Sequence, residues 1–354
     1  MAFANALRRG LTSAAISAAA GLVTLGALLP SAQAGPRPPV SPRPPAGTAR
    51  PGLHTAGKVA LGSSRGLFKD VFAEAPNGAV YYSRGSVVRV VNGNSAPAIA
   101  VRAGKRVFAL AATSSDLFVQ TGLRVTEYSR PGGRILRHWK LSSPVTPITF
   151  AGLLVVGRTL WSWTDWGTDQ SGFEFATLSR ISTSSPAVHK ISLQVYPADM
   201  DADASGLYFQ AQSKNGVHSY LAHATPSGSI RLRRDRNINA PLAISGRRVV
   251  VLSFHSDGHS YADSYRKSDL LRTSSRRVSA SDRAIAGTTA GLLILRQPCA
   301  QLTCASAAVG KLDPATGSVT GAVTVPHAFL LLPGPAGAVV TVTGGHMFLI
   351  RIAS

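Results

Sequence analysis

The chain has 354 residues, of which 37 are lysine or arginine and only 16 are aspartate or glutamate, so its formal net charge is +21 at pH 7. Such an excess of positive charge favours polyanionic neighbours through long-range attraction and counterion release. The sequence contains no Gly-x-Ser-x-Gly elbow, His-Glu-x-x-His pair or phosphate-binding glycine loop, which excludes the enzyme classes that depend on those motifs.

Residues 1–34 have the pattern of a cleavable export signal. Arg8-Arg9 gives a basic start, a weakly apolar run extends from Leu11 to Leu29, and Ala32-Gln33-Ala34 matches a small-residue cleavage site. A membrane anchor is the alternative, but Pro30 ends the run, and a span needs about 20 strongly apolar residues. We therefore predict a secreted protein without a transmembrane segment after cleavage, and leave general and twin-arginine export both open.

A proline-rich linker is predicted over residues 35–52. Proline lacks an amide donor and fixes φ, so this segment cannot build a strand ladder and should act as an extended spacer. No other proline-rich or charged run interrupts residues 53–354, which we predict to form a single domain. Removal of the signal takes away two arginines and no acid, which lowers the net charge from +21 to +19.

The apolar segments of this domain are short, rich in β-branched and aromatic residues, and bounded by Gly, Ser, Asn or Pro, as strands are. Seven of them recur about 38 to 47 residues apart, which is close to the blade spacing of propeller arrays. They are Ala79–Tyr82, Leu117–Gln120, Leu160–Trp163, Leu207–Gln210, Val249–Ser253, Leu292–Leu295 and Ala338–Val342. The pattern predicts an all-β fold: a seven-bladed β-propeller of four-stranded antiparallel sheets. Six or eight blades and a two-sheet sandwich are the alternatives.

The two ends of the domain support ring closure. The last unit has predicted strands at Ala328–Leu332, Ala338–Val342 and Met347–Ile352, and the chain then ends one strand short of a blade. Gly57–Leu61 is an apolar segment that has no unit of its own. We predict that this N-terminal strand completes the last blade, because the pairing removes exposed sheet edges.

One turn of the repeat supports a family resemblance. Residues Asp313–Val319 read Asp-Pro-Ala-Thr-Gly-Ser-Val between two predicted outer strands, with fainter versions at Pro131–Arg134 and Pro226–Ser229. The turn resembles the Asp-x-x-Thr-Gly turn of YVTN-type and quinoprotein-like (PQQ-like) propeller repeats, a resemblance that implies fold and not chemistry. The docking repeat, acidic residue and metal ligands of quinoprotein dehydrogenases have no counterparts that we can place, so we predict no cofactor and assign no catalytic residue.

Loop lengths predict where a site would lie. Loops between second and third strands share one face of a propeller with the connections between blades, and blades 3 to 6 are expected to carry the long ones. These are Thr164–Phe173, Ser213–His218, His255–Ser260 and Gln297–Thr303. Extra loop length on a compact scaffold usually carries function. The loop of blade 4 adds His218 to the candidate residues of this face.

Three of the four tryptophans lie within six residues of blade 3. Trp166, with Asp165 and Asp169 nearby, is a candidate platform for a carbohydrate or peptide, because an aromatic ring supplies contact area and carboxylates accept hydroxyl donors. Trp161 and Trp163 point to one side of the predicted strand, and their alternative role is inter-blade core, which we favour for both.

Two further motifs could bind metal ions, but each has a simpler interpretation. His255, Asp257 and His259 alternate in the loop of blade 5 and could hold a transition metal if the loop stays strand-like. Asp257-Gly258 is also a strong hairpin signal, which would separate the histidines. The acids of Asp199–Gly206 resemble the opening of a calcium loop but lack its downstream glutamate, so a turn is the better prediction. We predict no metal site and keep the three loop residues as binding-face candidates.

Positive charge is densest in blades 4 and 5. The predicted basic patch consists of Arg231, Arg233, Arg234, Arg236, Arg247 and Arg248. An anionic cell-surface polysaccharide or a protein is the expected partner, whereas nucleic acid is not favoured because aromatic residues are sparse around the patch. The alternative is that these arginines only solvate an outer face. Cys299 and Cys304, five positions apart in an exported chain, are expected to form a disulfide.

These observations together predict a monomeric, secreted β-propeller that binds a protein or an anionic surface polymer. The alternative is a propeller enzyme, a lyase or hydrolase, acting on carbohydrate or a related substrate. Its first candidate residues would be Asp165, Asp169, Glu174, His255, Asp257 and His259.

Overall fold

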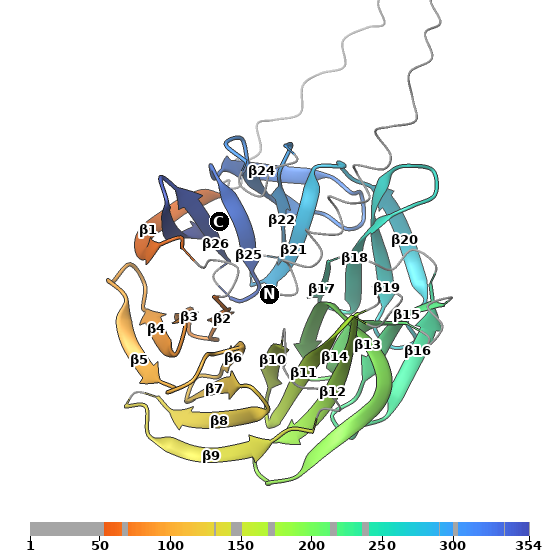
Figure 1. The fold of residues 1–354 in the computed structure, drawn as a ribbon. Helices are drawn as coiled ribbons and strands as arrows, with labels where there is room; N and C mark the ends of the chain where they lie inside the picture. The colour runs from red at the N-terminus through yellow and green to blue at the C-terminus, as the bar shows by residue number, and fades with distance from the viewer. Residues whose placement is uncertain are drawn as a thin grey trace, which may run out of the picture.

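The computed structural model describes residues 53–65, 70–130, 132–142, 151–168, 174–212, 218–235, 241–289, 291–299, 304–335 and 337–353. At residues 165–168, 174–176, 192–199 and 212 only the backbone is described. The predicted signal and linker lie outside these residues. Within them the chain forms 27 strands and no helix, so the prediction of an all-β fold is confirmed. The strands form sheets arranged around a central axis (Figure 1).

Four of the blades are simple antiparallel sheets whose strands follow one another along the chain. In blades 1 and 2 these are β2 (Phe72–Glu74), β3 (Val80–Arg84), β4 (Val87–Val91), β5 (Ala98–Arg102), β6 (Ala109–Ala112), β7 (Asp116–Thr121), β8 (Arg124–Ser129) and β9 (Ile135–Lys140). In blades 5 and 6 they are β17 (Leu242–Ser245), β18 (Arg248–Phe254), β19 (Ser260–Arg266), β20 (Arg272–Arg277), β21 (Asp282–Thr288), β22 (Gly291–Arg296), β23 (Ala308–Leu312) and β24 (Val319–Thr324).

Blades 3 and 4 share a strand and therefore form one continuous seven-stranded sheet. The first part of β13 (Val188–Asp203) pairs with β12 as the outer strand of blade 3, and its last part pairs with β14 as the inner strand of blade 4. The other strands are β10 (Ala151–Val156), β11 (Thr159–Thr168), β12 (Glu174–Ser182), β14 (Gly206–Gln212), β15 (Ser219–Ala224) and β16 (Ile230–Arg234). Seven blades of four strands thus arise from 27 strands, because β13 serves in two blades.

The ring closes as the sequence predicted. Blade 7 contains β25 (Ala328–Leu332), β26 (Ala338–Thr343) and β27 (His346–Ala353), and its fourth strand is β1 (His54–Ser63) from the other end of the domain. The antiparallel register places Lys58 opposite Ile350 and Val59 opposite Leu349. β1 extends beyond the predicted Gly57–Leu61 at both ends, and its pairing covers the edge of β27 that would otherwise be exposed.

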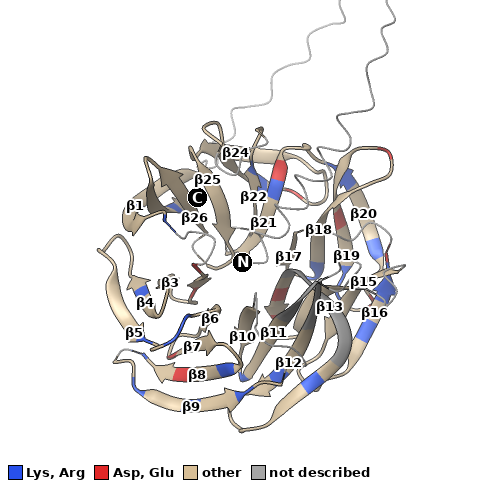
Figure 2. Cartoon of the chain, viewed as in Figure 1, with Lys and Arg blue, Asp and Glu red and all other residues tan. Residues whose placement is uncertain are grey.

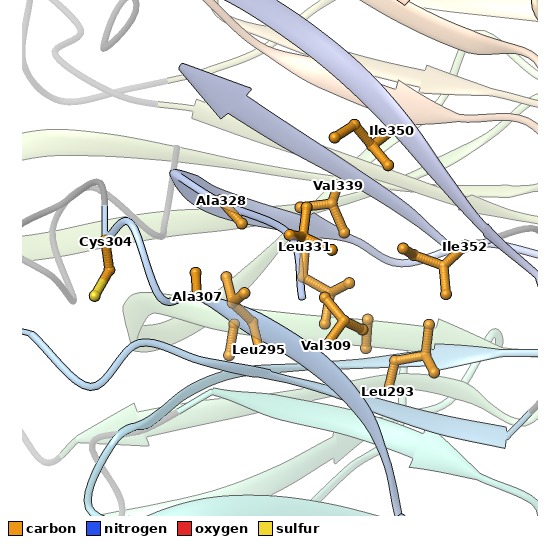
Figure 3. Close-up of a cluster of buried hydrophobic side chains, with 13 residues drawn as sticks. Leu293, Leu295, Cys304, Ala307, Val309, Ala328, Leu331, Val339, Ile350 and Ile352 are labelled. Carbon is orange, nitrogen blue, oxygen red and sulfur yellow. The ribbon is translucent and has the colours of Figure 1, made fainter. Parts of the chain in front are cut away.

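The core lies between the blades, where the faces of neighbouring sheets meet. Between blades 6 and 7, Leu293 and Val309 pack against Leu331 and Ile352 (Figure 3). Outer strands contribute little to this packing: all five residues of β16 are exposed. Burial of apolar side chains, at about 25 cal/mol per Å², is the main force that holds each pair of sheets together.

The predicted disulfide between Cys299 and Cys304 is present, with its two Cα atoms 5.8 Å apart. Cys304 is buried in the cluster between blades 6 and 7, and it forms an isolated antiparallel bridge with Ala328. The disulfide therefore closes the blade 6 loop, and the bridge between Cys304 and Ala328 joins the end of that loop to the inner strand of blade 7.

Candidate functional site

A propeller of antiparallel blades presents two different faces. The loops between second and third strands and the connections between blades lie on one face, which we call the loop face. The tight turns between first and second strands, and between third and fourth strands, lie on the opposite face, which we call the turn face. The sequence placed the candidate site on the loop face.

The tryptophan cluster of blade 3 is mostly core. Trp161 and Trp163 are 1% and 5% exposed and pack between blades 3 and 4 with Phe209, which confirms the alternative that the sequence favoured. Strand β11 continues through Asp165 and Trp166 to Thr168, so the loop is shorter than predicted. The side chains of Asp165, Trp166 and Glu174 and the whole of Asp169 lie outside the described structure, and the binding platform proposed for them stays a prediction.

The loop of blade 5 is a hairpin turn. The backbone N–H of His255 donates to the carbonyl oxygen of His259 over 3.0 Å, and Gly258 takes a φ of +79°, which favours glycine. The side chains then diverge: Asp257 accepts a hydrogen bond from the Tyr261 hydroxyl, which holds the pKa of its carboxyl below the usual value. The hairpin interpretation is therefore the better one, and the described residues contain no group of three side chains suited to a metal ion.

His255 has a partner that the sequence did not reveal. Its Nε2 lies 2.7 Å from Oδ2 of Asp263, a fully buried carboxylate on β19 that also accepts a hydrogen bond from the Ser253 hydroxyl. The Arg272 guanidinium lies 3.8 Å from the same oxygen. An imidazole oriented by a carboxylate can move protons. Asp263 is the one carboxylate of β19, and this is the signal by which the sequence could have identified it.

The acidic segment before Gly206 is the inner turn of blade 4, as predicted. Asp201 accepts a hydrogen bond of 2.7 Å from the backbone N–H of Ile244 in blade 5, and Asp203 forms a salt bridge with Lys267. Burial opposes ionisation of Asp203, but its hydrogen bonds from Lys267 and Ser205 prevail and lower its pKa. Both acids thus join blade 4 to its neighbour.

Several arginines join blades through backbone carbonyl oxygens of turns on the turn face. Nε of Arg276 in blade 5 donates over 2.7 Å to Ala315 O in blade 6, and Nε of Arg351 in blade 7 donates over 3.0 Å to Gly93 O in blade 1. Arg137 and Arg180 make equivalent bonds to the carbonyls of Thr183 and Pro226, one blade further on. Part of the excess positive charge therefore has a structural role in joining neighbouring blades.

The arginines of the predicted basic patch have a different environment. Arg231, Arg233 and Arg234 are exposed on β16, and Arg247 and Arg248 are exposed at the turn between β17 and β18. None of these five makes a salt bridge within the described residues, and Arg236 lies outside them. Figure 2 shows lysine and arginine along the outer strands β16 and β20 of blades 4 and 5. We call the five described arginines the basic edge.

A pocket of about 370 Å³ opens on the turn face between blades 4 and 5, and it continues into the basic edge. Nine residues line it: Ser205, Tyr208, His223, Thr225, Ser229, Ile230, Arg231, Lys267 and Ser268. Of these, Arg231 is the one that belongs to the predicted basic patch. The pocket is remote from the loop face, whose long loops in blades 3, 4 and 6 lie largely outside the described residues. His218, at the end of the blade 4 loop, is partly buried and does not line it.

The register of blade 4 explains the inner wall of the pocket. Asp201, Tyr208, His223 and Arg231 lie directly opposite one another on four successive strands, so their side chains share one face of the sheet. The rings of Tyr208 and His223 stack with centroids 4.3 Å apart and an interplanar angle of 7°. Nε2 of His223 lies 2.9 Å from the carbonyl oxygen of Ser205, and burial is the main cause of its lowered pKa. Burial therefore favours the neutral form of His223.

The fold defines the class of protein, a seven-bladed β-propeller, and comparison with known proteins agrees at that level. No known family model matches the sequence, and no curated protein is significantly similar to it. Among solved structures the chain is similar to a streptogramin B lyase, with a TM-score of 0.56 and 12% identity over 85% of this chain and 98% of the other.

Two further structures show the same similarity of fold. A chain of a mitotic checkpoint complex has a TM-score of 0.54 and 13% identity over 94% of this chain and 100% of its own length. Kuenenia stuttgartiensis hydrazine synthase has a TM-score of 0.51 and 10% identity over 79% of this chain and 94% of its own. At these identities the similarity shows the fold alone, and the finer resemblance to YVTN-type and PQQ-like repeats is not confirmed.

Proposed function

We propose that this propeller is a secreted binding module that recognises an anionic polymer outside the cytoplasm through its basic edge. The observation that carries the proposal is strand β16, whose five residues are all exposed and include three arginines without a salt bridge in the described structure. Closely spaced, unpaired cations on a rigid strand attract a polyanion and gain free energy by releasing its counterions. The arginines that join blades keep their charge, but each has part of its guanidinium bound to a backbone carbonyl oxygen, so fewer of its donors can bind a polymer.

Export is the second element of the proposal. It rests on the signal pattern of residues 1–34 and is compatible with the disulfide between Cys299 and Cys304, since such bonds persist in oxidising compartments. No helix in the described part of the chain is long and apolar enough to cross a membrane.

Binding of defined polyanions at several salt concentrations tests the proposal. Poly(glycerol phosphate), dextran sulfate and polygalacturonate serve as probes, with neutral dextran as the control polymer. The variant R231Q/R233Q/R234Q should lose affinity and flatten the plot of log K against log salt by about 2 to 3, since each ionic contact contributes about 0.9 to the slope. The matched control R102Q/R124Q/K140Q removes the same charge from exposed positions of blades 1 and 2.

Equal losses in the two triple variants would mean that net charge, and not the basic edge, attracts the polymer. Binding of an acidic protein, with no affinity for any of the polymers, would replace the polymer by a protein partner. Propellers serve in protein assemblies, as the mitotic checkpoint complex illustrates, but that similarity concerns the fold alone.

The alternative function, a lyase or hydrolase acting on carbohydrate or a related substrate, has one local observation in its favour. The 2.7 Å contact between His255 and Asp263 orients an imidazole at the loop face, as proton transfer requires. Turnover of a polysaccharide that is abolished by His255→Gln or Asp257→Asn, with folding intact, would establish an enzyme. Unchanged polymer length after prolonged incubation would leave the binding module as the function.

A further inference from the structure

We propose that the pocket between blades 4 and 5 on the turn face is a subsite for one oxyanion group of the bound polymer, such as a phosphate, sulfate or carboxylate. This inference rests on the proposed function, and it assigns the site that recognises the anionic group of each polymer unit. The pocket lies beside the first residues of β16 on the turn face, and Arg231 belongs both to the basic edge and to the lining of the pocket. A polymer that follows β16 therefore passes the mouth of the pocket.

The hydrogen-bonding capacity of the lining determines the class of ligand. The Lys267 ammonium has three N–H donors, of which one binds Asp203 and a second donates over 3.2 Å to the carbonyl oxygen of Gly246. One donor remains, and the Arg231 guanidinium has no internal partner in the described structure. The hydroxyls of Ser229 and Ser268 are likewise without a described partner. Unused donors from two cations and two hydroxyls form a lining suited to an oxyanion.

The other hydroxyls of the pocket are already engaged. The Ser205 hydroxyl donates to Oδ1 of Asp203 over 2.6 Å and lies 3.0 Å from the Tyr208 hydroxyl. The Thr225 hydroxyl accepts a hydrogen bond of 3.0 Å from the backbone N–H of Ser229. These bonds hold the walls in place, so binding requires little ordering of the side chains behind them.

The cationic wall from blade 5 is also fixed before any ligand arrives. Lys267 lies in a tight turn in which Leu270 is fully buried at a φ of +58°, and its backbone N–H donates over 3.1 Å to the carbonyl oxygen of Arg247. Its ammonium lies 5.7 Å from the ring centroid of Tyr208, so the aromatic floor helps to hold it. Lys267 and Arg231 line the pocket itself, whereas neither Asp203 nor Asp201 belongs to its lining.

The pocket has the size of a small ligand site. Its volume of about 370 Å³ lies at the lower end of the range of ~300–1,000 Å³ found for ligand pockets. That space accommodates a single anionic unit and not a length of polymer. With Nε2 of His223 at the Ser205 carbonyl oxygen, Nδ1 has no described partner, and in the neutral form it can accept from a hydroxyl next to the anionic group.

Titration of the folded protein with inorganic phosphate, sulfate and acetate, followed by amide chemical shifts, tests the subsite directly. Saturable shifts should be confined to residues around 205, 229–231 and 267–268. Ser229→Tyr fills the pocket without a change in charge, and Ser227→Tyr is its control in the same turn but outside the lining. We expect Ser229→Tyr and Arg231→Gln to weaken binding at least about tenfold, and Ser227→Tyr and Arg234→Gln to change it less than about twofold.

The same four variants, tested with the three polymers, separate this inference from the proposed function. If Arg231→Gln and Arg234→Gln weaken polymer binding equally and Ser229→Tyr has no effect, the subsite is wrong while the basic edge stands. If no polymer binds but phosphate or sulfate still saturates the pocket, the polymer function is wrong while the subsite stands. Unsaturable shifts spread over the whole surface would overturn the subsite. The polymer that depends most on Ser229 identifies the oxyanion.

Discussion

The indole Nε1–H of Trp139 donates a hydrogen bond of 2.9 Å to the backbone carbonyl oxygen of Ser185, which joins the outer strand of blade 2 to the last turn of blade 3. Trp139 is 2% exposed, although it lies on an outer strand whose other side chains are mostly exposed. The ring thus fills the gap between two blades and satisfies a turn carbonyl in one contact.

Substitution of Trp139 by phenylalanine should destabilise the fold by about 2–3 kcal/mol, because it removes the hydrogen bond and leaves a small cavity. Equilibrium unfolding in urea measures the loss. The adjacent His138 is exposed, so His138→Ala is the control and should change stability by less than about 0.5 kcal/mol. Equal stability of Trp139→Phe and the parent protein would show that the contact contributes nothing net.

The guanidinium bond from Arg180 to the carbonyl oxygen of Pro226 joins blades 3 and 4, and Arg180→Gln should cost about 1–2 kcal/mol. Arg158 is exposed in the turn between β10 and β11, on the turn face, and its side chain makes no hydrogen bond in the described structure. Arg158→Gln therefore removes the same charge without removing a contact. Thermal unfolding of both variants distinguishes a structural arginine from one that only solvates the surface. Similar melting temperatures for the pair would contradict the structural role.

Strand β1 offers a sharp test of ring closure, because neighbouring residues face opposite sides of the sheet. Val59 is buried in the apolar cluster between blades 7 and 1, whereas Ala60 is exposed. Val59→Asp should destabilise the protein by about 3 kcal/mol or more, since it buries a carboxylate without a partner. Ala60→Asp should have little effect.

Hydrogen exchange shows which strands the Val59→Asp substitution destabilises. In Val59→Asp the amides of β27 should exchange faster than those of blades 2 and 3, because β27 loses its outer neighbour. If the amides of all blades in this variant lost protection equally, closure would not be a local property of blade 7.

The repeat was predictable because each blade carries its own local signals. Leu292–Leu295 and Ala338–Val342 are apolar, bounded by glycine or proline, and spaced as blades are, so no long-range knowledge was needed. The sharing of β13 was not predictable. Only the acidic end of these 16 residues was assigned, to the inner turn of blade 4, and no local signal marks the continuity of β13 with blade 3.

The pocket could not be predicted from the sequence for a related reason. His223 and Arg231 become neighbours through strand register, but Lys267 reaches them only because the turn of blade 5 packs against blade 4. The contact between His255 and Asp263 lies within blade 5 and depends on how the turn that holds His255 folds over β19. Spacing identifies which residues share a strand, whereas inter-blade contacts depend on how the sheets pack.

A pH dependence is expected from Asp201, which lies between blades 4 and 5. Burial raises the pKa of its carboxyl from 3.8 to about 6, and the two backbone N–H groups of Ile244 and Ala202 that donate to it only partly oppose this effect. Nearby Asp203 raises the pKa further, and Lys267 lowers it. The folded protein therefore keeps a proton between about pH 4 and 6 that the unfolded chain has released.

Stability linked to Asp201 must therefore fall as the pH rises through that window, by up to about 1 kcal/mol per pH unit, and it should be constant above it. Asp201→Asn removes the ionisation while keeping an oxygen that can accept from Ile244. Urea unfolding of both proteins at pH 4.5, 5.5 and 7 isolates the effect, since every other titrating group is common to them. As the pH rises, the free energy of unfolding of the asparagine variant should increase relative to that of the parent protein. Parallel plots of the two free energies against pH would show that Asp201 is ionised in the fold without cost.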